Sequence, residues 1–140
     1  MTAMIIDQIS IFLENKAGAL SELIHLLADN QIDIEALSIA ESRDYGIMRI
    51  IVDKPAETVR VLKEKNIPHA ENEVLAVKVS DTPGSLTKIL SVLADSGISL
   101  AYSYAFLSRT MGEAFIVLRV DDNAAAEKIL NDAGIASQAS

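Results

Sequence analysis

Two short loops offer the clearest chemistry in this 140-residue chain. Each carries a glycine, Gly18 or Gly84, where a short alternating strand is followed by an amphipathic helix. The first turn of a helix leaves backbone N–H groups without intrahelical partners, and with the helix dipole these attract a carboxylate or a phosphate. Glycine lacks a Cβ, so an anion can approach the backbone closely. The loops therefore predict an anion site. For either loop alone, a plain strand-to-helix turn capped by Asn15 or Asp81 is the alternative.

The two loops belong to an internal repeat, because the two glycines lie 66 positions apart. Apolar helix positions share this offset in three pairs: Leu20 with Leu86, Leu23 with Ile89, and Leu27 with Leu93. Farther along, the offset grows to 68 between Leu62 and Leu130. That difference places two extra residues in a loop, where they cost little. A loop that recurs at the same place in two repeats favours a site over a simple turn.

Hydrophobic periodicity predicts six elements in each repeat, in the order β-α-β-β-α-β. In the first repeat they are expected at 9–14, 19–30, 32–39, 48–52, 55–64 and from 67. In the second they are expected at 75–79, 84–96, 98–107, 114–120, 123–133 and from 135. This order is typical of the ferredoxin-like unit, an antiparallel sheet with helices on one face. We therefore expect an α+β protein of two such units, 1–72 and 73–140.

The outward faces of the predicted sheets are half apolar. Five residues are expected there: Phe12, Ile47, Ile51, Phe115 and Val117. We expect another sheet, from the other unit or from a second chain, to cover this face. Scattered surface apolar residues are the alternative. A row of aromatic residues, Tyr102, Tyr104 and Phe106, could wall a ligand pocket, form a strand contact, or be ordinary strand aromatics.

Composition excludes several classes of function. A net charge of −8 argues against nucleic acid, whose affinity depends on Lys and Arg. Without cysteine there is no thiolate metal site, and His25 and His69 lack ligand spacing, so no metal is expected. No apolar run reaches the length of a membrane span, and no signal peptide is recognised, so we expect a cytoplasmic protein. No nucleophile stands beside a base, so no catalytic residue or cofactor is expected.

The loops and helices carry a resemblance to a known family. A strand, then D-x-P-G-x-L, then a helix ending in A-[DE]-x-x-I-[NDS]-[IL] resembles the ACT domain family, twice over essentially the whole chain. The second unit matches at Asp81, Pro83, Gly84, Leu86, Leu93, Ala94, Gly97 and Ile98. In the first unit Asn15 stands in place of the Asp and Ala17 in place of the Pro. The strand-start position, often Asn in the family, is Asp33 or Ser99 here.

The resemblance implies a non-catalytic regulatory protein that senses a free amino acid at the interface of two ACT units. The implied ligand-binding residues are Asn15, Ala17, Gly18, Ala19, Leu20 and Asp33, and Asp81, Pro83, Gly84, Ser85, Leu86 and Ser99. The implied partner is an enzyme of amino-acid biosynthesis, and a homodimer is expected. The alternative is a protein-interaction module that binds no small ligand. A small hydrolase is a third option.

Overall fold

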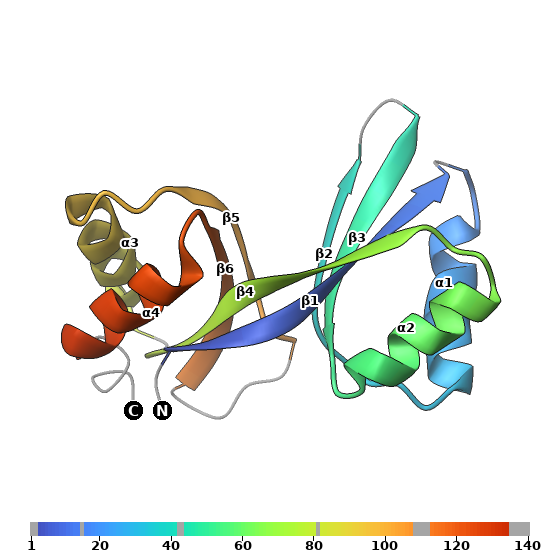
Figure 1. Cartoon of the computed structure of the whole chain (residues 1–140), viewed down its shortest axis with the longest axis horizontal. Coiled ribbons are helices and arrows are strands. Elements are labelled where there is room, and N and C mark those ends of the chain that lie inside the picture. Colours follow the sequence, from blue (N-terminus) through green and yellow to red (C-terminus); the bar gives the residue numbers. More distant parts are fainter. Residues whose placement is uncertain (1–2, 15, 42–43, 81, 108–112, 135–140) are drawn as a thin grey trace. The chain divides into compact units, whose positions relative to one another are not determined.

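The computed structural model describes residues 3–14, 16–41, 44–80, 82–107 and 113–134. Within them the chain forms a mixed α+β structure whose elements follow in sequence (Figure 1). They are β1 (Ala3–Glu14), α1 (Ala19–Asp29), β2 (Ile34–Glu41), β3 (Tyr45–Val52), α2 (Pro55–Glu64), β4 (His69–Ser80), α3 (Ser85–Asp95), β5 (Leu100–Ala105), β6 (Glu113–Val120) and α4 (Asn123–Asp132). The predicted α+β class is confirmed. The final strand, expected from residue 135, lies outside the described residues.

The described residues divide into two compact units. The N-terminal unit holds residues 7–72, and the C-terminal unit holds residues 73–134 together with 3–6. Residues 3–6 were expected in the first unit. They belong with the second because Ala3 is fully buried in its core. The Ala3 N–H also donates to Asn131 Oδ1 (3.1 Å), and Asn131 Nδ2 donates back to the Ala3 carbonyl (3.3 Å).

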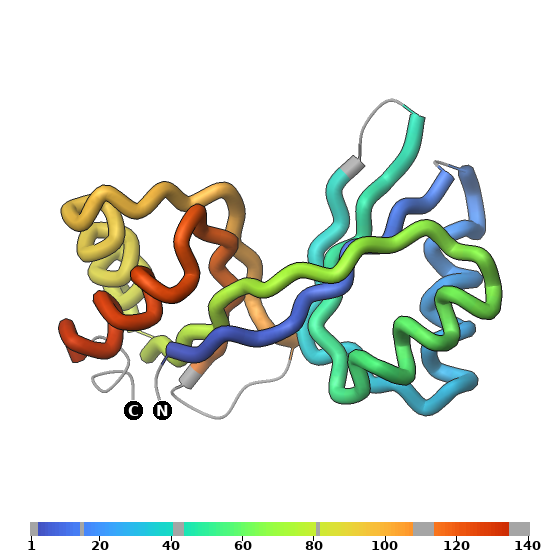
Figure 2. Tube along the Cα trace, viewed as in Figure 1, coloured from blue at the N-terminus to red at the C-terminus, as the bar shows by residue number. Residues whose placement is uncertain are grey.

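Strand β4 also differs from expectation, because it replaces two predicted short strands with one. It runs unbroken from His69 to Ser80, since this stretch contains neither Gly nor Pro to interrupt it. Residues 69–72 of β4 belong to the N-terminal unit, and residues 73–80 belong to the C-terminal unit. Figure 2 traces β1 and β4 as the two long strands of the chain. The strand order is β2-β3-β1-β4 in the N-terminal unit and β1-β4-β6-β5 in the C-terminal unit.

The N-terminal unit buries one apolar face of its sheet beneath two helices. Antiparallel pairing sets Ile9 opposite Ile50 and Ile11 opposite Met48, so these four side chains share one face. Helix α1 contributes its buried Leu23 and Leu27, and helix α2 its buried Val59, Val61 and Leu62. These residues form one hydrophobic cluster.

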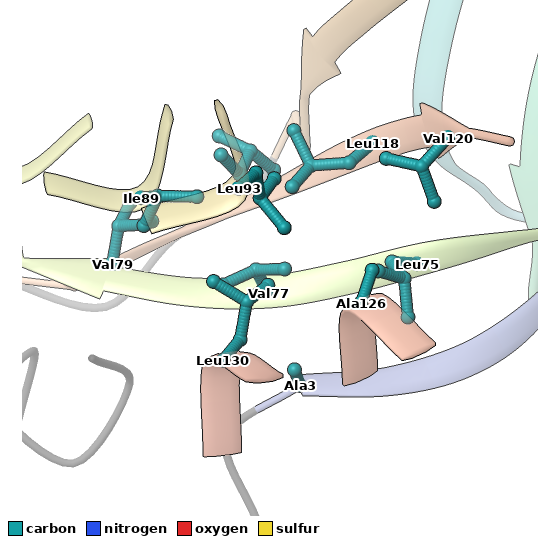
Figure 3. Close-up of a cluster of buried hydrophobic side chains, with 11 residues drawn as sticks. Ala3, Leu75, Val77, Val79, Ile89, Leu93, Leu118, Val120, Ala126 and Leu130 are labelled. Carbon is teal, nitrogen blue, oxygen red and sulfur yellow. The ribbon is translucent and has the colours of Figure 1, made fainter. Parts of the chain in front are cut away.

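The C-terminal unit has an equivalent core, shown in Figure 3. Ile89 and Leu93 come from α3, and Leu130 comes from α4. They meet Val77 of β4 and Leu118 of β6. The core face of β6 carries Ile116, Leu118 and Val120, which are all buried, and Ala114, which packs against the cluster. Gly134 follows α4 with φ of 67°, the left-handed conformation that often ends a helix at a glycine.

The opposite sheet faces are unequally buried. Ile51 and Val117 are buried outside both core clusters, whereas Phe115 is 38% exposed. The covering of this face by another sheet stays a prediction. On β5, the Tyr102 and Tyr104 rings stack with centroids 6.4 Å apart. The strand is shorter than the predicted range 98–107.

Candidate functional site

The start of helix α1 leaves backbone donors open. Gly18 stands at the N-cap with φ of 86°, and no described side chain caps the helix. The Ala19 N–H donates to the Lys16 carbonyl (3.3 Å) in the preceding turn. The next two amides, those of Leu20 and Ser21, lie too early in the helix for an intrahelical partner. Among the described residues no acceptor is found for them, so they can serve an incoming anion.

Helix α3 repeats this arrangement in the C-terminal unit. Gly84 is its N-cap with φ of 90°, again without a described side-chain cap. The Ser85 N–H donates to the Thr82 carbonyl (3.3 Å), and the hydroxyls of Thr82 and Ser85 lie 2.9 Å apart. The same backbone geometry therefore recurs at both glycines that the sequence analysis singled out.

The other two helices begin differently. Helix α4 is closed by Asp122, whose Oδ1 accepts the Ala125 N–H (3.0 Å). Helix α2 places Pro55 in its first turn, and proline has no N–H to leave open. A left-handed glycine at the N-cap thus distinguishes α1 and α3 from α2 and α4.

A pocket of about 180 Å³ adjoins the start of α1 in the N-terminal unit. It is lined by Leu13, Glu14, Lys16, Ala19, Leu20, Ile39, Gly46, Ile47 and Met48. Its wall is mostly apolar, and its charged pair is Lys16 and Glu14, whose side-chain atoms lie 3.3 Å apart and are exposed. An opposite-charge pair beside open amides suits a small zwitterion with a short apolar side chain.

The structure brings together only some of the predicted ligand-binding residues. Ala19 and Leu20 line the pocket, whereas Ala17 and Gly18 are exposed in the loop beside it. In the C-terminal unit, Pro83, Gly84 and Leu86 are exposed and Ser85 is half-buried. Asn15 and Asp81 lie outside the described residues.

Asp33 and Ser99 lie away from the loops of their own units. Asp33 follows the C-terminal end of α1, and a helix of that length spans about 16 Å. Its N–H donates to Asp53 Oδ1 (2.9 Å), and the Asp53 N–H donates to the Asp33 carbonyl (3.1 Å). Ser99 and Asp121 repeat this exchange at 3.3 Å in both directions. Within its own unit, each therefore holds the start of a strand.

Gly84 is constrained by its own backbone conformation rather than by close neighbours. A Cβ at Gly84 would meet nothing within 4 Å, so there is room for a side chain. The cost lies in the backbone, because φ of 90° is strained for any L side chain. A β-branched residue there would therefore disturb the start of α3.

Sequence reasoning missed part of the pocket. It assigned no role to Lys16 or to Ile39, both of which line the pocket. Gly46 carried a detectable signal, because Gly112 repeats it 66 positions later. Asp53 and Asp121 were detectable in the same way, because they repeat at the offset of 68 that also relates Leu62 to Leu130.

Titratable groups with shifted pKa values lie elsewhere, on exposed helix surfaces. A hydrogen bond from Arg60 lowers the pKa of Glu57, and a hydrogen bond to Asp132 raises the pKa of Lys128. Among the described residues, no three His, Cys, Asp or Glu side chains are grouped to hold a metal ion. No described helix is long and apolar enough to span a membrane.

Comparison with known proteins identifies similar structures and the family of this chain. A protein designated BT0572 from Bacteroides thetaiotaomicron has a similar structure, with a TM-score of 0.87 and 34% identity over 94% of this chain and 90% of that one. The regulatory subunit of aspartate kinase from Thermus thermophilus shares the fold, with a TM-score of 0.64 and 15% identity over 95% and 97% of the two chains.

A curated relative is the acetolactate synthase small subunit of Buchnera aphidicola, 23% identical over 100 residues. The match covers 60% of this chain and 63% of the relative, so the chain spans less than two thirds of that relative's length. A family model described as the ACT domain pair matches residues 4–138. Since this match covers nearly the whole sequence, the chain belongs to the ACT domain pair family.

Proposed function

We propose that this chain is a regulatory protein that binds a free amino acid at the start of α1. The observation that carries the proposal is the combination of open amides behind Gly18 with a pocket that holds Lys16 and Glu14. The α-carboxylate would accept from the Leu20 and Ser21 amides and pair with Lys16. The α-ammonium group would pair with Glu14. Gly84 and the amides behind it form the equivalent proposed site in the C-terminal unit.

The size of the pocket limits the ligand. Pockets for drug-sized molecules typically measure about 300–1,000 Å³, and this one measures about 180 Å³. Its apolar wall offers Leu13, Leu20, Ile39 and Met48 to the side chain of the ligand. We therefore propose an amino acid with a small apolar side chain rather than a large or charged one.

The family membership supports a regulatory role. The relatives include a small subunit of acetolactate synthase and a regulatory subunit of aspartate kinase. We propose that this chain acts on an enzyme of amino-acid metabolism in the same manner. The ligand would shift the equilibrium between two conformations of the chain toward the one that the enzyme recognises. The size of this shift is set by the difference between the ligand's affinities for the two conformations.

Calorimetric titration of the full chain with each of the twenty amino acids tests the proposal. We expect Lys16→Gln to weaken binding about five- to tenfold, because one charge-assisted hydrogen bond is lost. Ile39→Gln should weaken it as well, since Ile39 lines the pocket. Lys63→Gln is the matched control, because Lys63 is exposed and does not line this pocket. Equal affinity in all three variants would remove this pocket from the site.

A further inference from the structure

A second, larger cavity lies in the N-terminal unit between α1 and the turn 65–68 that precedes β4. Its volume is about 410 Å³, within the usual range of about 300–1,000 Å³ for small-molecule sites. Its lining comprises Phe12, Leu13, Glu14, Lys16, Ala19, Glu22, Leu23, Leu26, Lys65, Asn66, Ile67 and Pro68. It shares Leu13, Glu14, Lys16 and Ala19 with the smaller pocket and is otherwise separate.

The turn that walls this cavity is held in place by the backbone. Asn66 has φ of 55°, a left-handed conformation, and its N–H donates to the Lys63 carbonyl (3.1 Å). The Ile67 N–H donates to the Leu62 carbonyl (3.0 Å), and the Phe12 N–H donates to the Pro68 carbonyl (3.0 Å). A wall tied at three points is preorganised, so a ligand does not have to order it.

The charges on the lining are unequally available. Lys16 lies 3.3 Å from Glu14 and also lines the smaller pocket. Lys65 is exposed at the end of α2, where it follows the last helical residue. It lines the larger cavity only, together with apolar residues from α1 and the turn, among them Leu26 and Ile67. One available cation beside an apolar lining complements an anion that carries an apolar chain.

We propose that this cavity binds a small organic monocarboxylate with an apolar chain, whose carboxylate pairs with Lys65 and whose chain contacts Leu26 and Ile67. Lys65, Leu26 and Ile67 lie outside the smaller pocket, so the proposal does not rest on the proposed amino-acid site. Two sources share this chemistry, a 2-oxo acid and an apolar amino acid, which differ in the ammonium group. Glu22 also lines the cavity and offers a carboxylate to an ammonium group.

The test is a titration of the ¹⁵N-labelled full chain with 4-methylpentanoate, followed by amide chemical shifts. We expect saturable shifts at residues 65–67 and at Leu26. Binding should be about five- to tenfold weaker in Lys65→Gln, and for the uncharged 4-methylpentanamide, because either change removes a charge-assisted hydrogen bond. Lys63→Gln is the matched control, since it removes the same charge two residues earlier and outside this cavity. Equal weakening in both lysine variants, or shifts absent from residues 65–67, would overturn the proposal.

Leucine and 4-methyl-2-oxopentanoate distinguish an amino acid from a 2-oxo acid as the ligand of this cavity. If leucine binds more tightly than 4-methyl-2-oxopentanoate, and Glu22→Gln removes that preference, the ligand is an amino acid. If the oxo acid binds at least as tightly, the ligand is an oxo acid. Either result supports the shared chemistry, whereas failure of both to bind overturns it. Ile39→Gln affects the smaller pocket only, so loss of one site is distinguishable from loss of the other.

Discussion

At the scale of single residues, two glycines set the start of both helices that follow the repeated loops. Gly18 and Gly84 have φ of 86° and 90°, which no L residue adopts without strain. We predict that Gly18→Ala destabilises the chain by about 1–2 kcal/mol. Gly46→Ala is the control, because its φ is not positive and its Cβ would meet only the Ala40 carbonyl oxygen at an ordinary 3.6 Å. Urea unfolding measures both. Equal stability of the two variants would contradict this account of Gly18.

The sequence indicates that both glycines stand at the start of a helix, but it predicts only some of the residues around them. Their recurrence at one offset is visible in a single chain. The pairing of Lys16 with Glu14 is not, because it depends on how the loop turns after β1. Ile39 likewise joins the pocket through the pairing of β2 with β3, where it stands opposite Met48. Contacts between distant segments are therefore what sequence reasoning missed.

At the scale of elements, helix α2 carries a surface ion-pair cluster. Arg60 hydrogen-bonds Glu57 and pairs with Glu64, at spacings of three and four residues. The hydrogen bond from Arg60 is the main cause that lowers the pKa of Glu57. A carboxylate with a lowered folded-state pKa stabilises the fold above its unfolded-state value. That contribution is lost as the pH falls through the folded-state pKa.

We therefore predict that Arg60→Gln makes stability less sensitive to acid. Arg60→Gln should have a lower free energy of unfolding than the unchanged chain at pH 7. This difference should shrink below about pH 4, where free Glu side chains become protonated. Lys63→Gln, on the same helix, should show no comparable pH dependence. Urea midpoints measured from pH 7 to pH 3 provide the comparison. A difference that stays constant with pH would count against the ion pair.

The start of β1 depends on one side chain of α4. Asn131 both accepts from and donates to the backbone of buried Ala3. We predict that Asn131→Ala costs about 1–2 kcal/mol, because it leaves buried backbone groups unpaired. Asn131→Asp should cost less, since its carboxylate still accepts the Ala3 N–H. Hydrogen exchange at the Ala3 amide should be faster in Asn131→Asp than in the unchanged chain, and fastest in Asn131→Ala. Unchanged exchange in both variants would show that Asn131 does not hold β1.

At the scale of the whole molecule, the repeat predicts two units but not how strands are allotted to them. Period-2 alternation predicts that a segment is extended and which face is apolar. It does not indicate which unit the end of that strand joins. Residues 3–6 are therefore assigned only when Ala3 is seen in the C-terminal core. The two cores themselves were predictable, because each is built from the apolar faces of its own helices.

The central claim is that this ACT domain pair binds a free amino acid, and a thermal-shift screen of the full chain against the twenty amino acids tests it most directly. A ligand present at a hundred times its dissociation constant adds about 2.7 kcal/mol of stability. For a chain of this length that corresponds to a rise in Tm of roughly 5–10 °C. The account predicts such a rise for one or two amino acids with small apolar side chains. In Lys16→Gln, where binding is about five- to tenfold weaker, the added stability should fall to about 1.4–1.8 kcal/mol and the rise in Tm should shrink in proportion. A screen in which no amino acid raises Tm would contradict the claim.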